Sequence, residues 1–487
     1  MISLGELLSI DKQSDTPVYL QISNAIIMLV RRGIFKMGSK LPSSRDLAKQ
    51  LSINRNTVNA AYEELAAQDW IEIRARVGYF ISGKLPGIQP RELGNTNTGN
   101  AAATTGNFPL NELPFQFINP VQGGYFPYRI YDGFPDPRLA PLEALLREAK
   151  RQVSLASFQP YLRYGSHFGP APLLDALKNY LHNSRGLKIG EDNLMVTNGA
   201  QMGIYLACKV LIKPGDTVIV GEPGYFIAND TFKTAGAKLI QVPVDNDGLQ
   251  VENLERICKK TSPKLLYVIP HHHHPTTVTL SPERRLQLLA LAAKYRFAIL
   301  EDDYDYDYHY NSNPILPMAS LDDHGNVIYI GTLNKLLVPA VRAGFMVGPK
   351  NFIQQAAQYR RIIDWQGNSF IENALATIID NGTLNRHVQK VQKIYHERRD
   401  HFCRLLGDEL GDAIQFQIPN GGMSVWTKFL YHPLKKISAA AAKKGLKMSD
   451  GSEYNTAGID YNSLRIGFTS FNFAEQESVI KILRSTL

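Results

Sequence analysis

The sequence is poor in cysteine and lacks long apolar runs. Its three cysteines (Cys208, Cys258 and Cys403) are too scattered for a disulfide framework, so we expect free, buried thiols. No apolar run approaches the roughly 20 residues that cross a bilayer. Acidic residues interrupt any signal-peptide pattern in the first thirty positions. These absences predict a cytoplasmic protein.

The chain is too long for one compact domain. One hydrophobic core usually stops growing near 250–300 residues, at about half the 487 residues present. Hydrophobic residues make up 44% and charged residues 20%, as in ordinary globular proteins. The net charge of +8 mildly favours a polyanionic partner but decides little by itself.

The first part of the chain, residues 1–83, has the pattern of a small separate unit. Helical periodicity runs through residues 17–32, and two shorter helices are expected at 44–51 and 55–67. Two short strands follow, with a basic turn between them. This order predicts a winged helix-turn-helix that binds double-stranded DNA.

The second short helix and the strand turn carry the side chains that DNA recognition needs. A recognition helix presents short polar and cationic groups to the major groove, and a helix start binds phosphate. The candidate contacts are Arg45, Arg55, Asn56, Thr57, Asn59, Arg74, Arg76 and Gly78. From the pattern alone, a helical dimerisation module with merely solvated arginines remains an alternative.

Three segments of this unit resemble the GntR family of bacterial regulators. They are residues 17–22 (PVYLQI), 38–48 (GSKLPSSRDLA) and 54–65 (NRNTVNAAYEEL). The resemblance covers most of residues 15–81. It implies that Arg45, Arg55, Thr57 and Gly78 contact DNA.

The rest of the chain changes character twice. Residues 84–114 have too little apolar content to pack and are expected to form a flexible linker. Residues 115–487 alternate helical and strand patterns, which predicts an α/β domain with a mainly parallel sheet. Residues from about 370 to 487 suit a smaller α+β subdomain. The expected strands are 194–197, 217–220, 238–242, 265–269, 298–301, 327–329, 423–428 and 463–469.

A lysine follows one of these strands after a short polar turn. Pyridoxal phosphate needs a lysine amine to form an imine with its aldehyde, and cations and hydroxyls to hold its phosphate. In residues 331–342 (GTLNKLLVPAVR), Lys335 could provide the amine, and Thr332 and Arg342 could hold the phosphate. Taken alone, this pattern is more typical of a surface lysine.

An acidic strand end offers a partner for the cofactor ring. In residues 298–304 (AILEDDY), Asp302 could stabilise a protonated ring nitrogen, and Tyr304 could bind the ring's phenolic oxygen. A metal-ligand pair or a solvated acidic loop remain alternatives. The neighbouring carboxylates are expected to be solvated or to cap helices; they belong to Asp303, Asp305 and Asp307.

Two further turns could complete the site. The strand before Gly199 breaks into a helix, whose free N–H groups at Gly199, Ala200 and Gln201 could bind phosphate. In residues 222–225 (EPGY), Tyr225 could stack on the ring. A core tyrosine is the alternative for Tyr225.

Together these patterns and their order resemble the class I and II aminotransferases of fold type I. The resemblance covers roughly residues 125–487. It implies that Tyr164, in residues 164–169 (YGSHFG), reaches the phosphate of a neighbouring subunit. It also implies that Arg465, in residues 464–468 (LRIGF), grips a substrate carboxylate.

A winged helix, a linker and this domain in one chain resemble the MocR subfamily of GntR regulators. Residues 132–139 (DGFPDPRL) and 301–305 (EDDYD) share its pattern. Its members are typically head-to-tail homodimers that sense pyridoxal phosphate, often with an amino compound. The four histidines 271–274 stand where a His-Gln-x-Pro-x-Gly turn is common. Because neighbouring side chains diverge, we expect no shared metal.

Departures from the subfamily pattern bear on the ligand. Thr277 replaces a glycine, Asn334 a serine and Leu333 a phenylalanine. Ile227 stands where the branch that senses γ-aminobutyrate has arginine, which argues against that ligand or that binding mode.

These observations favour a transcription regulator that binds pyridoxal phosphate through Lys335 and senses an amine or amino acid that displaces this lysine from the cofactor. A working or weak aminotransferase with an accessory DNA-binding module is the second hypothesis. A nucleic-acid-binding scaffold that has lost the cofactor is the third.

Overall fold

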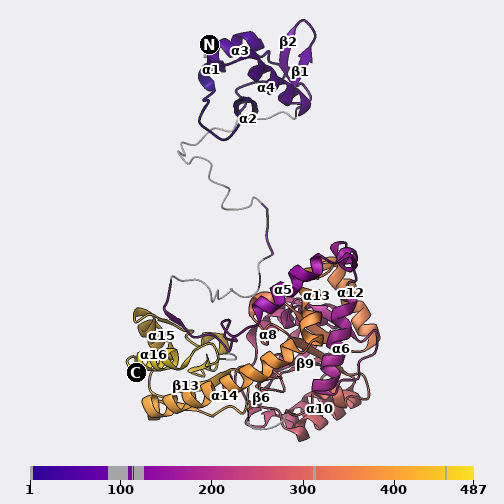
Figure 1. Cartoon of the computed structure of the whole chain (residues 1–487), viewed down its shortest axis with the longest axis vertical. Helices are drawn as coiled ribbons and strands as arrows, with labels where there is room; N and C mark the ends of the chain where they lie inside the picture. The colour runs from indigo at the N-terminus through magenta and orange to yellow at the C-terminus, as the bar shows by residue number, and fades with distance from the viewer. Residues whose placement is uncertain (1–3, 86–107, 112, 114–124, 311–313, 456–457) are drawn as a thin grey trace. The chain divides into compact units, whose positions relative to one another are not determined.

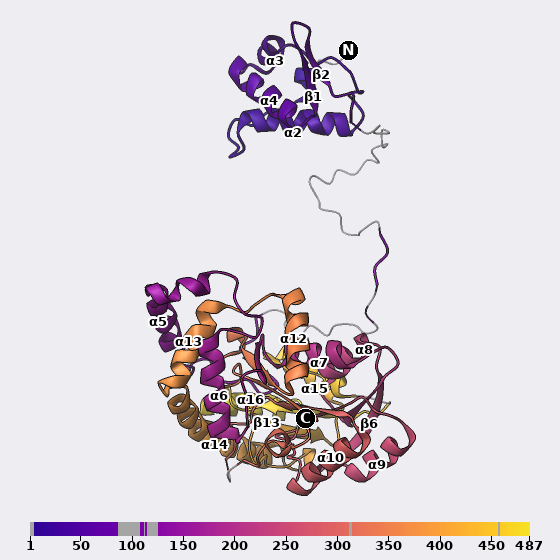
Figure 2. The same cartoon turned by 90° about the vertical axis from the view of Figure 1, so that its right-hand side faces the viewer.

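A computed structural model describes residues 4–85, 108–111, 113, 125–310, 314–455 and 458–487. The chain divides into two compact units, Met1–Leu110 and Asn111–Leu487 (Figures 1 and 2). Most of the predicted linker, residues 84–114, lies outside the described residues. The predicted domain boundaries therefore stay predictions.

The first unit is a small helical domain with a two-stranded hairpin. Its core is formed by apolar side chains of α2, α3, α4 and both strands. The order agrees with the expected winged helix-turn-helix. The elements are α1 (Leu4–Leu7), α2 (Val18–Arg31), α3 (Ser44–Leu51), α4 (Arg55–Ala67), β1 (Ile71–Arg74) and β2 (Gly78–Ile81).

Local capping determines where the two middle helices begin. The side chain of Ser43 accepts a hydrogen bond from the backbone N–H of Asp46, at the start of α3. Asn54 does the same for Asn56 at the start of α4, at 2.8 Å. Between the helices, Ser52 adopts a left-handed conformation that ends α3. Such caps are typically worth about 1 kcal/mol each.

The second unit contains an eight-stranded sheet in the order β4-β11-β10-β9-β8-β5-β6-β7. Neighbouring strands from β10 to β6 are parallel, whereas β11 runs antiparallel to both its neighbours. The prediction of a mainly parallel α/β sheet is confirmed. The strands are β4 (Leu194–Thr197), β5 (Thr217–Glu222), β6 (Lys238–Asp245), β7 (Gly248–Leu249), β8 (Leu265–Val268), β9 (Ala298–Asp303), β10 (Val327–Thr332) and β11 (Gly344–Val347).

Helices cover both faces of this sheet. Along β5, Val218 and Val220 face one layer and Ile219 the other, as the two-residue period of a strand requires. Figure 2 shows α7, α8 and α12 on one side of β6, and α9 and α10 on the other. These helices are α7 (Ala200–Leu211), α8 (Phe226–Thr234), α9 (Val251–Lys260), α10 (Pro282–Tyr295) and α12 (Lys350–Ile363).

A third group of helices lies on the same face of the large sheet as α9 and α10. α13 (Ser369–Asp380) packs against α5 (Leu142–Val153) and α6 (Ala171–Arg185). Their apolar side chains form a core with β4 and β11. Thus the first residues after 370 pack with the large sheet.

The end of the chain forms a smaller sheet with its own core. Its strands are β12 (Ile414–Phe416), β13 (Ser424–Phe429) and β15 (Ser463–Gly467), in that order. It shares its core with α14 (Thr383–Leu410), α15 (Leu434–Lys443) and α16 (Phe473–Arg484). β3 (Tyr128–Arg129) pairs with β14 (Leu446–Lys447), so the segment after β3 runs along this subdomain. No helix of the described ranges has the length and hydropathy that crossing a lipid bilayer requires.

Candidate cofactor site and DNA-reading surface

The predicted cofactor residues follow strands of the large sheet where those strands end. Because β4, β5, β8, β9 and β10 run in the same direction, their carboxyl ends lie at one edge of the sheet. Ligands of open α/β sheets bind at that edge. The predicted residues that follow these strands are Gly199, Tyr225, Tyr304 and Lys335.

Lys335 is enclosed by aromatic rings. Its ammonium donates a hydrogen bond of 2.6 Å to the carbonyl of Gly133. It also lies 4.4 Å from the ring centre of Phe134 and 5.7 Å from that of Tyr304. Burial lowers the pKa of Lys335 to about 8, although nearby carboxylates led by Asp132 oppose the shift. The amine is therefore partly deprotonated near neutral pH and able to attack an aldehyde.

Asp302 ends β9 as a buried carboxylate with one unsatisfied oxygen. Its Oδ2 accepts a hydrogen bond of 2.7 Å from the hydroxyl of Tyr267, on the neighbouring strand. Its Oδ1 is buried and has no hydrogen-bond partner among the described residues. Burial raises the pKa of Asp302 to about 7, and the Tyr267 hydrogen bond opposes the shift. A buried oxygen in this state suits a cationic N–H donor.

Tyr304 and Arg465 form one hydrogen-bonded group. Arg465, on β15, donates 2.7 Å to the Tyr304 hydroxyl, which in turn donates 2.9 Å to the carbonyl of His272. Arg465 is 1% exposed. The structure thus brings a residue of the small sheet, far away in sequence, to the edge that carries Lys335.

The turn after β4 meets the turn after β10. Arg342 donates a 2.6 Å hydrogen bond to the carbonyl of Asn198. A methyl group at Gly199 would stand 2.9 Å from Nδ2 of Asn334 and 3.3 Å from the Arg342 guanidinium. Thr332 holds this turn together, since its hydroxyl donates to the Ala343 carbonyl at 3.1 Å.

The start of α7 leaves backbone N–H groups for an anion. Gly199 caps this helix with φ of 85°, and Ala200 is its first residue. The side chain of Gln201 points elsewhere, because its amide donates 2.8 Å to Thr231 on α8. Only backbone groups of Gln201 can therefore contribute to a phosphate site at this turn.

Tyr225 lies beside His274 at the carboxyl edge of the sheet. Its ring centre is 4.9 Å from that of His274, and the two rings meet edge to face. Nε2 of His274 lies 2.5 Å from Oδ2 of Asp132. Sequence reasoning missed Asp132, His274 and Tyr267, because each takes part through a contact with a distant segment.

The four consecutive histidines have four different partners. Nδ1 of His271 lies 3.1 Å from Asp303, and Nδ1 of His272 lies 2.9 Å from Asp305. The ring of His273 contacts Thr276, and the ring of His274 contacts Asp132. Among the described residues, no group of three or more His, Cys, Asp or Glu is arranged to hold a metal ion.

The expectation of solvated acids after Asp302 was wrong. Asp303 and Asp305 are buried, and each is paired with a histidine. Asp307 forms an ion pair of 2.6 Å with the buried Arg185. A run of acids after a strand could not reveal this, because the partners come from other strands and helices.

Tyr164 stands apart from the other predicted residues. It is 83% exposed, and its ring centre lies 5.4 Å from that of Trp365. No contact within the described ranges joins it to the group around Lys335. Its predicted role in a partner subunit's site stays a prediction.

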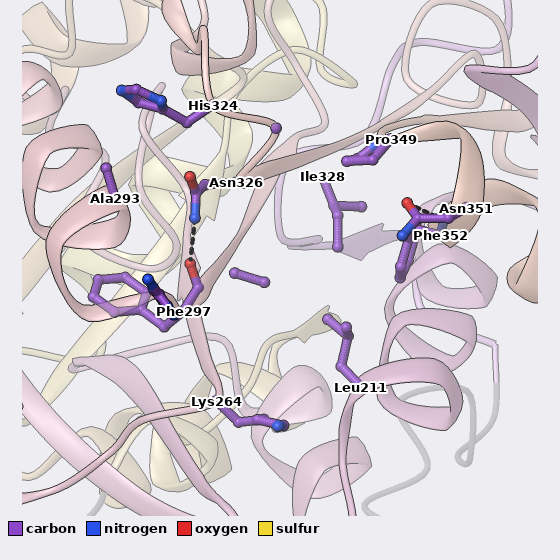
Figure 3. Close-up of a pocket in the computed structure, with 13 residues that line it drawn as sticks. Leu211, Lys264, Ala293, Phe297, His324, Asn326, Ile328, Pro349, Asn351 and Phe352 are labelled. Carbon is purple, nitrogen blue, oxygen red and sulfur yellow. Dashed lines mark hydrogen bonds between the residues drawn. The ribbon is translucent and has the colours of Figure 1, made fainter.

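A pocket at the opposite edge of the sheet contains none of the predicted site residues. It opens beside the amino ends of β8, β9 and β10, between Lys264, Phe297 and Asn326 (Figure 3). Asn326 closes one wall with a 3.2 Å hydrogen bond to the carbonyl of Phe297. Phe352 and Leu211 form the apolar side. The cofactor candidates therefore remain those of the carboxyl edge.

The predicted DNA contacts lie on exposed parts of α3, α4 and the hairpin. Arg45 and Asn56 are exposed, and Thr57 and Asn59 are half-buried. Arg55 donates a 3.2 Å hydrogen bond to Ser44, which ties the start of α4 to that of α3. The first two turns of α4 thus offer polar groups to solvent from a fixed position.

The hairpin tip is exposed and basic. The Arg74 guanidinium lies 4.4 Å from the ring centre of Phe80, and Arg76 occupies the turn with φ of 62°. Gly78 follows at φ of 133°. A side chain there would be strained, so the tip depends on glycine.

The residues present at the carboxyl edge fit pyridoxal phosphate. The buried Oδ1 of Asp302 lacks a partner that a protonated ring nitrogen would provide. The glycine turn beside Asn334 and Arg342 has no room for a Cβ and can admit phosphate oxygens close to backbone. Lys335 carries a half-buried amine of lowered pKa.

Comparisons with known proteins match both units. The model of the aminotransferase class I and II family matches residues 134–483, and that of the gntR family of bacterial regulatory proteins matches residues 18–81. The probable rhizopine catabolism regulatory protein MocR of Rhizobium meliloti is 28% identical over 488 residues, 96% of each chain. The HTH-type transcriptional regulator YdfD of Bacillus subtilis is 29% identical over 94% of each chain.

Solved structures match the larger unit. A multiple substrate aminotransferase of Thermococcus profundus has a TM-score of 0.70 at 27% identity, covering 75% of this chain and 92% of its own. A kynurenine aminotransferase of Pyrococcus horikoshii has a TM-score of 0.68 at 30% identity, covering 74% and 90%. With a class I and II aminotransferase domain behind a GntR domain, the chain belongs to the MocR subfamily of GntR transcription regulators.

Proposed function

We propose that this regulator holds pyridoxal phosphate at Lys335 and changes its DNA binding when an amino compound joins the cofactor. One observation carries the proposal: a half-buried lysine, Lys335, whose amine has a lowered pKa, and the buried carboxylate of Asp302, which has one oxygen without a described partner, share the sheet edge of a chain that also has a DNA-binding unit. Burial of both groups is costly for folding alone, which indicates a role in binding.

The residues of the chain would divide the work of binding. Pyridoxal phosphate supplies an aldehyde that a lysine amine captures and a ring that draws electrons from a bound amine. Asp302 would hold a proton on the ring nitrogen, and Tyr304 would orient the ring's phenolic side. The phosphate would be held by the start of α7 and by Arg342, and by Thr332 if its hydroxyl turns away from the Ala343 carbonyl.

Regulation requires two arrangements of the chain with different affinities for the ligand. A ligand shifts such an equilibrium only by its affinity difference between the two states. A homodimer in which Tyr164 completes the partner's phosphate site would link two sites and two DNA-binding units. The exposure of Tyr164 supports this arrangement.

The proposal is tested with the purified full chain. Soaking in pyridoxal phosphate should give a visible absorbance band, and borohydride treatment should then fix the cofactor's mass on the protein. Lys335→Ala should abolish both, whereas Lys350→Ala, an exposed lysine on α12, should change neither. A colourless wild-type protein without mass gain would contradict the proposal.

DNA binding is tested on genomic fragments. Sequencing the fragments that the chain retains, with and without pyridoxal phosphate, should give a specific site whose occupancy depends on the cofactor. Retention that is independent of both sequence and cofactor would favour the third hypothesis, a nucleic-acid-binding scaffold that has lost the cofactor.

Transaminase activity is the second candidate, since the larger unit has the class I and II aminotransferase fold and its sequence contains the candidate residues Lys335, Asp302 and Arg465. A turnover assay separates the two functions. Fast turnover of several amino acids without specific DNA binding would make the enzyme the main function. We expect slow or absent turnover, because a sensor must hold its ligand.

A further inference from the structure

The guanidinium of Arg465 faces a carboxylate of its own chain. Its Nε lies 2.6 Å from Oδ1 of Asp132. The other oxygen of Asp132 lies 2.5 Å from Nε2 of His274. Asp132 follows β3, whose pairing with β14 brings this segment along the small subdomain. The guanidinium that is expected to bind a ligand's carboxylate is thus already next to the carboxylate of Asp132.

This contact does not use the full capacity of Arg465. Neither Nε of Arg465 nor Oδ1 of Asp132 has an aligned hydrogen bond within the described part of the chain. Nη1 reaches the carbonyls of His273 and Pro275 only at 3.4 and 3.5 Å. Arginine binds a carboxylate best through two parallel N–H groups. Asp132 therefore neutralises the charge of the guanidinium but leaves its Nε–H group without a well-aligned hydrogen bond.

Asp132 is charged but not locked in place. Burial opposes its ionisation, yet His274 and Arg465 hold the pKa of Asp132 below its usual range. About 35% of its side chain is exposed, although Oδ1 is buried. The carboxylate can leave Arg465 by turning toward its solvent-exposed side.

We propose that Asp132 is a tethered competitor for the Arg465 clamp, so that the site favours amines without a carboxylate over amino acids with the same side chain. A group tethered beside its partner acts at a local concentration on the order of millimolar or more. A ligand carboxylate has to displace it, whereas an amine reaches Lys335 without doing so. The amine part of this inference rests on the proposed function.

The wall beside Asp132 indicates which ligand body to use as a probe. The ring centre of His274 lies 5.8 Å from that of Tyr454, which meets Trp426 edge to face at 5.1 Å. Tyr225 closes the row. An aromatic ligand body suits this wall.

The test uses three ligands that share a phenethyl body. L-Phenylalanine carries amine and carboxylate, phenethylamine only the amine, and 3-phenylpropanoate only the carboxylate. Calorimetric titration is done on the full chain, with the first two ligands after cofactor loading and the third without cofactor. The variants are Asp132→Asn, Arg465→Gln, their double variant, and Asp192→Asn as an exposed control of equal charge change.

Wild-type protein should bind phenethylamine more tightly than L-phenylalanine. Asp132→Asn should tighten L-phenylalanine by about tenfold or more relative to phenethylamine, a change of about 1.4 kcal/mol. It should also create binding of 3-phenylpropanoate. Arg465→Gln should remove both gains from the double variant, and Asp192→Asn should leave the wild-type preference unchanged.

Two results would overturn the assignment of Asp132. One is an equal ratio of L-phenylalanine to phenethylamine affinity in wild-type protein and Asp132→Asn. The other, which needs no cofactor, is equal affinity of both proteins for 3-phenylpropanoate. If Asp132→Asn does not fold, tighter wild-type binding of L-phenylalanine than of phenethylamine overturns it. A chain that takes up no cofactor contradicts the proposed function, while the 3-phenylpropanoate titration still decides the role of Asp132.

Discussion

Tyr267 and Asp302 are joined by a 2.7 Å hydrogen bond between adjacent parallel strands, β8 and β9. The phenol satisfies one oxygen of the carboxylate, and the other is left buried without a partner in the described structure. Burial raises the pKa of Asp302 to about 7, and the hydrogen bond from Tyr267 opposes this shift. A group in that state makes the protein's stability depend on pH and on whatever occupies the site.

Asp302→Asn should stabilise the cofactor-free protein at pH 8. An acid whose pKa is raised in the folded state binds more protons folded than unfolded, so stability falls as pH rises from about 4 to about 7. The asparagine keeps the Tyr267 hydrogen bond and removes this loss. At 1.36 kcal/mol per pKa unit, the gain at pH 8 is at most about 4 kcal/mol.

Thermal unfolding of both proteins at pH 5 and pH 8 checks this prediction. The advantage of the variant should be clearly smaller at pH 5, because the wild-type carboxyl is then mostly protonated in the folded state. An advantage of the same size at both pH values, or none, would show that burial does not raise the pKa of Asp302. In the loaded protein the same change should weaken cofactor binding.

Gly199→Ala should lower cofactor affinity by more than its effect on stability explains. The added methyl would stand 2.9 Å from the Asn334 amide and 3.3 Å from Arg342, at the proposed phosphate turn. Gly215→Ala is the matched control, since Gly215 has a similar φ of 92° and open space around its Cβ position. Both changes strain the backbone, by about 1 kcal/mol or more.

Titration with pyridoxal phosphate, followed by visible absorbance, separates the two effects. Gly199→Ala should bind at least about tenfold more weakly, which corresponds to about 1.4 kcal/mol, while Gly215→Ala binds as wild type does. Equal affinities of the two variants would remove this turn from the phosphate site.

Local signals allowed much of the fold to be predicted. Helices α3 and α4 were predicted with their observed bounds because Ser43 and Asn54 cap them within a few residues. Six of the eight strands of the large sheet were predicted from short apolar runs, and β7 and β11 were not. β11 has only four residues, one of which is Gly344, and the nearby Arg342 has φ of 53°. So short a segment shows no alternation of apolar and polar residues from which a strand could be predicted.

The site was predictable where one segment carries its own pattern. Lys335 and Asp302 were predicted from local motifs and their order along the chain, and Arg465 from the resemblance to the aminotransferases. Asp132 and Tyr267 were not, because their importance comes from partners on other strands. The same reason explains the wrong expectation for Asp303 and Asp305, since their histidine partners lie on a separate segment. Tertiary contacts of this kind have no local signature.

Arg185→Met should destabilise the larger unit strongly. The Arg185 guanidinium is buried and lies 2.6 Å from Asp307, and it also donates 2.9 Å to the hydroxyl of Tyr329. Removing one member of a buried pair leaves the other charge without compensation, at a cost of about 3–5 kcal/mol. Arg151→Met is the matched control, because Arg151 contacts Glu148 at the same 2.6 Å on an exposed helix face.

Urea unfolding of both variants measures the contrast. Arg151→Met should leave the unfolding midpoint of the larger unit almost unchanged, since exposed ion pairs contribute little. If the two variants shift the midpoint alike, burial does not decide the contribution of these pairs. In a Trp70→Phe background, tryptophan fluorescence follows the larger unit alone, through Trp365 and Trp426.

Arg45→Ala and Arg55→Ala should weaken DNA binding and flatten its dependence on salt. Each phosphate contact adds about 0.9 to the slope of log affinity against log salt. Arg55 is held by Ser44 at 3.2 Å, so it is oriented before DNA arrives. Lys12→Ala, also in the smaller unit and exposed, removes the same charge outside the predicted surface.

Titrations of the retained operator at several salt concentrations separate local contact from general attraction. Loss of a phosphate contact should lower the slope by about one for Arg45→Ala and for Arg55→Ala, and leave it unchanged for Lys12→Ala. If all three variants lose affinity equally with the same slope, the net charge of the unit attracts DNA and the start of α4 does not position it. An altered preference for single base pairs in Arg55→Ala alone would instead assign Arg55 to a base edge, because phosphate contacts carry no sequence information directly.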